Sequence, residues 1–296
     1  MAGQLDKTFG VWAVTILFSA ILLGMGLLQV YLYFVWYTQD KWGIKATVLT
    51  ITALEIAQSG LFFSAMYTII IDHFGDFDQL NIIPWQATTQ LLLIYLTTFV
   101  AQSYFSYVIY LLEKKRFWFP LGIVILSFIA LGAGVAQTIL SFRIKFFSDL
   151  PSTSAATNTQ AALALTCDIL VTVGLCWQLS ISRTAVQSTN AVVNFIIVTA
   201  INRGVLTMVT AALNMILFLT KPGTFYFMFV LILSGKFYMN SMLAMLNTRK
   251  HAHTLYELHQ VVPVSMGSFV APNNHGVNII VTHETTSDRD ASKASL

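Results

Sequence analysis

Charged side chains are scarce in this sequence, and their scarcity decides the class of protein. Asp, Glu, Lys and Arg make up 10 % of the 296 residues, whereas hydrophobic residues make up 56 %. Soluble domains carry about 25 % charged residues. The composition therefore excludes an ordinary soluble domain. The expected partner is a lipid bilayer, and no nucleic-acid partner is expected.

Cysteine and proline are also rare, with two and six residues. Cys167 and Cys176 fall in one predicted helix and cannot bridge each other there, so no disulfide framework is expected. Pro120 lies at the start of a predicted helix and Pro222 lies in a loop. The predicted helices are thus almost free of proline, which gives little support to a transporter built on broken helices.

Known catalytic motifs are missing as well. The sequence has no Gly-x-Ser-x-Gly, no His-Glu-x-x-His, no P-loop and no glycine-rich dinucleotide motif. We therefore expect no enzyme, no catalytic residue and no cofactor. The loop 72–78 gathers three aspartates and a histidine, which would suit a metal ion, but Gly75 favours a solvated turn. No metal site is predicted.

Seven long apolar segments are present instead. A membrane-spanning helix needs about 20 mostly apolar residues, and the segments that qualify are 10–36, 46–71, 86–112, 118–140, 159–182, 192–219 and 224–246. The first is longer than the core of a cleavable signal, which is about 7–15 residues, so we expect it to remain as an anchor. The predicted fold is an all-α membrane protein with a seven-transmembrane helix bundle over residues 1–250.

The distribution of basic residues predicts the orientation. Lys and Arg near helix ends are retained in the cytoplasm. With seven crossings, the side of the N-terminus carries Lys7, Arg143, Lys145 and Lys221, and the other side carries Lys41, Lys45, Lys114, Lys115, Arg116, Arg183, Arg249 and Lys250. The N-terminus is therefore expected outside and the C-terminus in the cytoplasm. The plasma membrane is a candidate location, although the sequence does not specify the membrane.

Four charged residues lie near the middles of predicted helices: Glu55, Asp168, Arg203 and Lys236. One ionised group at the bilayer centre costs at least about 2.5–3.5 kcal/mol, so these groups are expected to pair inside the bundle. Five of the predicted helices also carry polar residues along one face. The candidate intramembrane network consists of Glu55, Gln102, Asp168, Asn202, Arg203, Lys236 and Asn240.

Two interpretations of this network remain open. It is either a structural network that fixes helix order and register, or a site for a ligand, an ion or a proton, because charged groups in membranes are often functional. Lys236 also makes retinal a candidate ligand, because retinal forms a Schiff base with a lysine in the seventh helix of some seven-helix proteins. Microbial rhodopsins carry an Asp one turn earlier, where this chain has Ile232, which argues against retinal.

Several motifs resemble a known family. They are Gln29-Val30-Tyr31-Leu32-Tyr33-Phe34, Ile83-Pro84-Trp85, Asn202-Arg203-Gly204, Lys236-Phe237-Tyr238-Met239-Asn240-Ser241 and Leu246-Asn247-Thr248-Arg249. The chain resembles, over most of residues 9–250, an uncharacterised seven-helix membrane protein family of basidiomycete fungi, known as a domain of unknown function. The resemblance implies a fold and a membrane location without an activity. It favours an architectural role for Lys236 and Asn240, whereas Arg203 departs from the small or neutral residue expected there.

Residues 251–296 differ in character from the rest, because polar and charged residues dominate them. We expect a cytoplasmic tail with a short surface helix over 251–260 and disorder beyond it. The leading functional hypothesis is a receptor- or sensor-like bundle with a polar, charged core. The alternatives are a small-solute or proton transporter and a structural membrane scaffold without a ligand. The sequence names neither the ligand nor a protein partner.

Overall fold

A computed structural model describes residues 10–73, 76, 81–113, 116–181, 187–221 and 224–261, with backbone alone for 187–196, 199, 200, 203 and 250–261. Within these residues the chain is all-helical, apart from an isolated β-bridge between Ile82 and Phe146. The α-helices are α2 (Val11–Trp36), α3 (Trp42–Tyr67), α4 (Trp85–Leu112), α5 (Trp118–Arg143), α6 (Ser154–Ile181), α7 (Gln187–Thr220) and α8 (Tyr226–Val261). A π-helical turn, η2 (Thr68–Asp72), extends α3, and a 3-10 helix, η4 (Phe147–Thr153), precedes α6.

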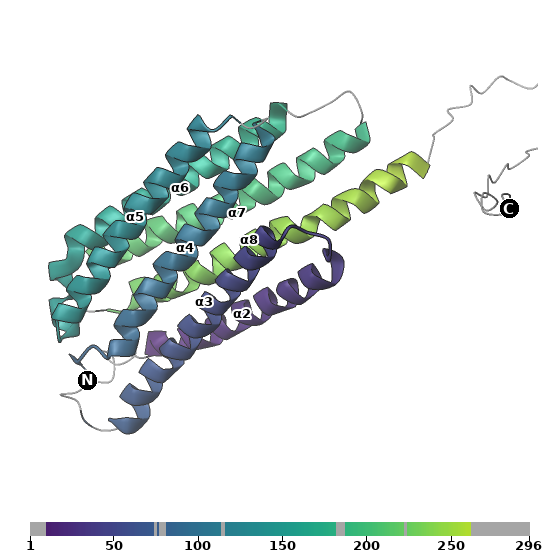
Figure 1. Cartoon of the computed structure of the whole chain (residues 1–296). Helices are drawn as coiled ribbons and strands as arrows, with labels where there is room; N and C mark the ends of the chain where they lie inside the picture. Colours follow the sequence, from purple (N-terminus) through teal and green to yellow (C-terminus); the bar gives the residue numbers. More distant parts are fainter. Residues whose placement is uncertain are drawn as a thin grey trace, which may run out of the picture. The chain divides into compact units, whose positions relative to one another are not determined.

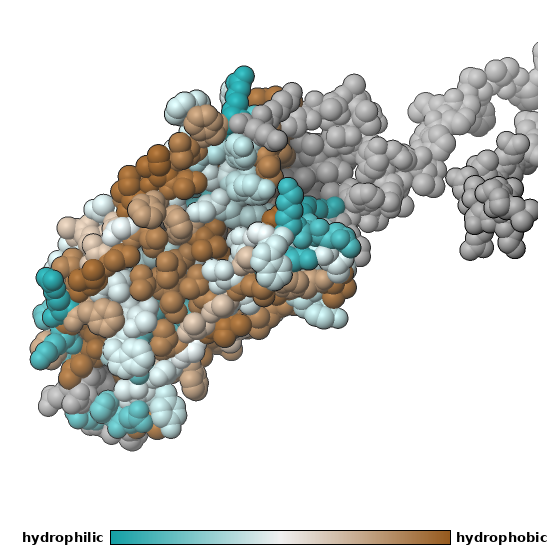
Figure 2. All heavy atoms as spheres, viewed as in Figure 1, coloured by the Kyte–Doolittle hydropathy of each residue, from teal (hydrophilic) through white to brown (hydrophobic). Residues whose placement is uncertain are grey.

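The outer surface of the bundle is apolar. Large side chains on four different helices are more than half exposed: Leu17 59 %, Phe63 60 %, Phe128 65 % and Trp177 66 %. Figure 2 shows apolar residues over much of one face, with hydrophilic groups gathered towards its ends. Soluble proteins rarely expose contiguous apolar surface on this scale. The chain is therefore a multi-pass membrane protein whose helices contact lipid.

Within the described residues, six helices are long and apolar enough to cross a membrane, and the apolar part of α7, Gly204–Thr220, is shorter. The predicted all-helical fold is confirmed for this part of the chain. Seven crossings and an outer N-terminus stay predictions. The acidic loop 72–78 lies mostly outside the described residues.

The helices pack as a ring in sequence order, with α8 closing against α2 (Figure 1). Helix α4 lies towards the middle, because it contacts α6 and α8 in addition to its neighbours α3 and α5. Helices α2 and α8 run in the same direction. Trp12 near the start of α2 packs against Phe225 beside the start of α8, and Tyr37 after the end of α2 donates to the Asn247 carbonyl.

Two packed regions hold the ends of the bundle. At one end Trp12 packs against Phe62, Phe147 and Phe225. The α3–α4 loop also contacts η4 there, because the side-chain amide of Asn81 donates to the Ser148 hydroxyl and accepts from the Ser148 backbone N–H. At the other end α2 and α8 meet through polar groups of the α2–α3 loop. The two ends thus differ in chemistry, and the interior between them carries the buried polar groups.

Some details differ from the sequence prediction. Helix α8 runs without interruption to Val261, whereas a separate short helix was expected over 251–260. The α-helical backbone continues because that stretch has neither proline nor glycine to end it. Residues 262–296 of the predicted tail lie outside the described residues. In α5 the small residues do not act alike: Gly134 is buried against Tyr95, whereas Gly132 faces open space.

Candidate functional site

The interior holds an ion pair between α3 and α8. Lys236 Nζ lies 2.6 Å from Glu55 Oε2, and both side chains are 0 % exposed. The ammonium also donates to Gln58 Oε1, one turn along α3, and Gln58 donates to Gln90 Oε1 on α4 at 3.2 Å. A buried ion pair needs such additional hydrogen bonds to offset the loss of water. The lysine therefore joins three helices through one polar chain.

Gly235 makes room for this pair. A Cβ atom on Gly235 would lie 2.5 Å from Glu55 Oε1, which is closer than any stable contact. The same carboxylate oxygen is buried and has no hydrogen-bond partner among the described residues. The absence of a side chain at Gly235 thus lets α8 approach the carboxylate that binds the next residue in the chain.

A second buried carboxylate joins α6, α8 and α4. Tyr238 donates its hydroxyl to Asp168 Oδ2 at 2.6 Å, and Gln102 Nε2 lies 3.3 Å from Asp168 Oδ1. Gln102 in turn accepts a hydrogen bond from Ser127 on α5 at 2.8 Å. Hydrogen bonds to a charged group are stronger than neutral ones. Asp168 thus connects four helices through side chains whose polar ends are buried.

A third polar group lies between α2 and α8. Asn240 donates from Nδ2 to the Leu22 carbonyl at 3.0 Å, and its Oδ1 accepts from Gln29 Nε2 at 3.3 Å. One further pair of turns along α8, Asn247 donates to the Gln29 carbonyl at 2.8 Å. Arg249 closes the interface with an ion pair of 2.5 Å to Asp40, which also accepts from Tyr33. These contacts fix the register of α8 on α2.

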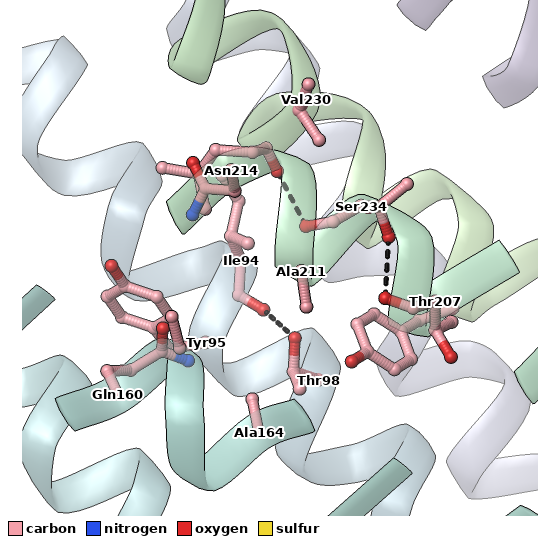
Figure 3. Close-up of a pocket in the computed structure, with 14 residues that line it drawn as sticks. Ile94, Tyr95, Thr98, Gln160, Ala164, Thr207, Ala211, Asn214, Val230 and Ser234 are labelled. Atoms are coloured by element: carbon pink, nitrogen blue, oxygen red, sulfur yellow. Dashed lines mark hydrogen bonds between the residues drawn. The ribbon is translucent and has the colours of Figure 1, made fainter. Parts of the chain in front are cut away.

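A cavity of about 40 Å³, lined by apolar side chains and several polar ones, lies among α4, α6, α7 and α8. Figure 3 shows side chains of all four helices around it, including Thr98, Gln160, Asn214 and Ser234. A water-sized guest needs at least about 10–15 Å³ on this measure, so the cavity holds two or three non-hydrogen atoms. The ring of Tyr238 forms part of its wall. The cavity and the Asp168 network therefore share a side chain.

Asn214 is the group that marks this cavity as a binding site. Its side chain is 7 % exposed, and its Oδ1 atom is buried with no hydrogen-bond partner among the described residues. An unsatisfied buried polar group costs about 1–3 kcal/mol. A guest that donates a hydrogen bond to this oxygen would remove that cost. The arrangement can bind a small polar molecule, and it presents no nucleophile with an adjacent base.

The structure brings most of the predicted network together, in separate groups. Glu55 binds Lys236, Gln102 binds Asp168, and Asn240 binds α2. Asn202 is exposed and joins none of these groups, which corrects its predicted place in the interior. Two residues along a helix turn the side chain by about 200°, so Asn202 points away from the face that carries buried Gly204. The side chain of Arg203 lies outside the described residues.

Sequence reasoning missed part of the site. Tyr238, Gln90 and Asn214 stand outside the predicted set, although each binds or lines a buried polar feature. Asn214 lies four residues after Thr210 and seven after Thr207, and all three are buried. That spacing places them on one face of α7. This shared face was the signal in the sequence that could have added Asn214 to the set.

Comparison with known proteins extends the description of the C-terminal half. No curated protein and no solved structure matches the chain. The match to a family model begins in α6 and ends in α8, so it includes Asp168, Asn214, Lys236 and Tyr238 but not their partners on α3 and α4. Residues 164–251 match the model of a family of unknown function, DUF6534.

Proposed function

We propose that this membrane protein is receptor- or sensor-like and binds a small polar solute in the cavity among α4, α6, α7 and α8. The observation that carries the proposal is the buried, unpartnered Asn214 Oδ1 on the wall of that cavity. Without a guest in the cavity such an acceptor stays unsatisfied, at a cost of about 1–3 kcal/mol. A bound guest stabilises the folded chain by satisfying it.

The contact between the cavity and the Asp168 network supports a sensing role. Tyr238 lines the cavity with its ring and holds Asp168 with its hydroxyl. A guest packed against this ring acts on a network that reaches Gln102 and Ser127, on α4 and α5. A ligand shifts a conformational equilibrium only through different affinity for two states. The shared tyrosine is the group through which occupancy changes the packing of α6 and α8.

The Glu55–Lys236 pair has a different role in this proposal. Its lysine has acceptors on two residues of α3, and it does not line the cavity. We assign it to architecture, as the resemblance of its segment to the fungal family implies. The seven-helix basidiomycete type, the outer N-terminus, the cytoplasmic C-terminus and a plasma-membrane location belong to the same proposal.

A thermal-stability screen tests the proposed function. The full chain and the variant Ala164→Leu are purified in detergent and mixed with small polar solutes. The rise in unfolding temperature that each solute causes is then compared between the two proteins. Ala164 lines the cavity and is buried, so leucine fills it, whereas Ala162→Leu on the exposed face of α6 is the matched control. A solute that binds the cavity raises the unfolding temperature of the parent and of Ala162→Leu but not of Ala164→Leu.

Ala211→Val, on the α7 wall, fills the same space with a smaller change if Ala164→Leu fails to fold. Equal stabilisation of the parent and both cavity variants contradicts the proposal. Gradient-driven uptake of the stabilising solute into proteoliposomes indicates the transporter alternative. If no solute changes the unfolding temperature, the proposal fails and the structural scaffold is the alternative that remains.

A further inference from the structure

We infer that the guest of this cavity is ammonium or a small primary ammonium ion, an inference that rests on the proposed function. The chemistry of the wall carries it. The cavity offers hydroxyl acceptors whose protons are already donated, a buried amide oxygen, aromatic side chains and little space. Each feature favours a compact cation with several N–H donors.

The hydroxyl groups on the wall have given their protons to backbone carbonyls. Thr98 donates to the Ile94 carbonyl at 3.0 Å, Thr210 to the Thr207 carbonyl at 2.9 Å, and Ser234 to the Leu231 carbonyl at 2.7 Å (Figure 3). A hydroxyl has one donor and two acceptor lone pairs. With the donor used inside the helix, the lone pairs remain for a guest. These three groups therefore receive hydrogen bonds from a guest and give none.

Asn214 adds a fourth acceptor. Its Oδ1 atom is buried without a partner among the described residues, on the α7 side of the cavity. Acceptors thus come from α4, α7 and α8, so they surround a guest on several sides. An ammonium ion has four N–H donors and a primary ammonium has three, in a roughly tetrahedral arrangement. Such a guest satisfies acceptors on three helices at once, which a single hydroxyl donor does not.

Aromatic rings complete the wall. Tyr95 and Tyr238 both line the cavity. Their hydroxyl groups are engaged elsewhere, by donation to Gln137 and to Asp168. The face of an aromatic ring attracts a cation, and the attraction strengthens where water is excluded.

The volume limits the size of the guest. About 40 Å³ accommodates roughly three water-sized units. Ammonium, methylammonium and ethylammonium have one to three non-hydrogen atoms and fit. Tetramethylammonium has no N–H donor and is too large. Amino acids and sugars are excluded by size.

Thermal unfolding of the full chain tests this inference. Ammonium chloride and methylammonium chloride are compared with sodium chloride and tetramethylammonium chloride at equal chloride concentration. We expect a saturable rise in unfolding temperature with the first two salts alone. A hydrogen bond to a charged group is worth enough that its loss weakens binding about tenfold or more. Asn214→Leu is therefore expected to raise the half-maximal methylammonium concentration at least about tenfold.

Thr98→Val removes an acceptor on α4 instead of α7 and is expected to weaken methylammonium binding in the same way. It replaces Asn214→Leu if that variant fails to fold. The matched control is Thr166→Val, because Thr166 also donates to a carbonyl one turn earlier but is exposed on α6. Its response must equal that of the parent. Equal responses of all variants, or equal effects of all four salts, overturn the inference.

Formamide and ethanol, neutral molecules with three non-hydrogen atoms each, separate this inference from the proposed function. If they stabilise the parent but not Ala164→Leu, while the ammonium salts have no effect, the cavity is a binding site for a neutral solute. The inference then fails and the proposed function stands. If neither class of solute acts through the cavity, both fail.

Discussion

Tyr238 donates a hydrogen bond of 2.6 Å to the buried carboxylate of Asp168 while its ring forms part of the cavity wall. One side chain therefore links a buried charge on α6 with the space among four helices. The two residues are separated by one complete helix, α7, in the sequence, and both lie in the segment that matches the DUF6534 family. The hydroxyl of Tyr238 thus links α6 directly to α8, two helices that pack mainly against other helices.

Tyr238→Phe is expected to lower the thermal stability of the full chain. The substitution keeps the ring and removes the hydroxyl, so Asp168 loses a charged hydrogen bond worth about 1.5–3 kcal/mol. Tyr226→Phe is the control, because Tyr226 lies exposed at the start of α8. Melting in detergent measures both. Similar unfolding temperatures for the two variants would show that the Asp168 bond contributes nothing to stability.

Glu55→Gln and Lys236→Met are each expected to destabilise the chain strongly, because each leaves a buried charge without its partner. Breaking a buried pair costs about 3–5 kcal/mol. The double variant is expected to recover much of the loss, since neither charge then remains. Detergent unfolding is often irreversible, so the order of the unfolding temperatures is the measurement. If the single variants are as stable as the parent, the pair is not the structural link described above.

Gly235→Ala is expected to weaken the same pair without removing either charge. The new methyl group would lie 2.5 Å from Glu55 Oε1, so the carboxylate or the helix must move. Gly132→Ala is the matched control in α5, where nothing lies within 4 Å of the added atom. It is expected to leave stability unchanged or slightly raised, because alanine favours helix over glycine. A loss of stability in the control equal to that in Gly235→Ala would rule out the steric explanation.

The orientation is tested by labelling single cysteines in intact cells with a membrane-impermeant maleimide. With the N-terminus outside and seven crossings, Ser152→Cys and Lys221→Cys react in intact cells, and Lys41→Cys reacts only after permeabilisation. The parent is the control, because Cys167 is buried and Cys176 is half-buried within α6. Lys221→Cys decides whether α7 crosses. Labelling of Lys41→Cys in intact cells would reverse the orientation.

The sequence predicts the helical fold well because apolar length and the cost of buried charge leave few alternatives. It identifies Glu55 and Lys236 as interior groups, but it does not show that they bind each other. The partner depends on the order of helices around the ring, and in particular on α3 contacting α8. Spacing along one helix gives the face on which a residue lies and not the helix that the face meets.

The glycines of α5 illustrate the same limit. Gly132 and Gly134 both appear in a run of small residues, yet only Gly134 packs against another helix, at Tyr95. The cavity likewise could not be predicted from the sequence. It arises from how side chains on four helices fill the space between them, and a volume of about 40 Å³ depends on the sum of small misfits. Spacing places Asn214 on the polar face of α7, but only the packing of the helices leaves its oxygen buried without a partner among the described residues.

The proposed site is tested most sharply by an experimental structure of the full chain in lipid nanodiscs, at a resolution that shows ordered water. Samples contain methylammonium chloride, formamide or sodium chloride alone. We expect a guest from one of the first two samples within hydrogen-bond distance of Asn214 Oδ1, against the ring of Tyr238. A cavity with the same contents in all three samples, or closed by side chains, would contradict a ligand site in this bundle.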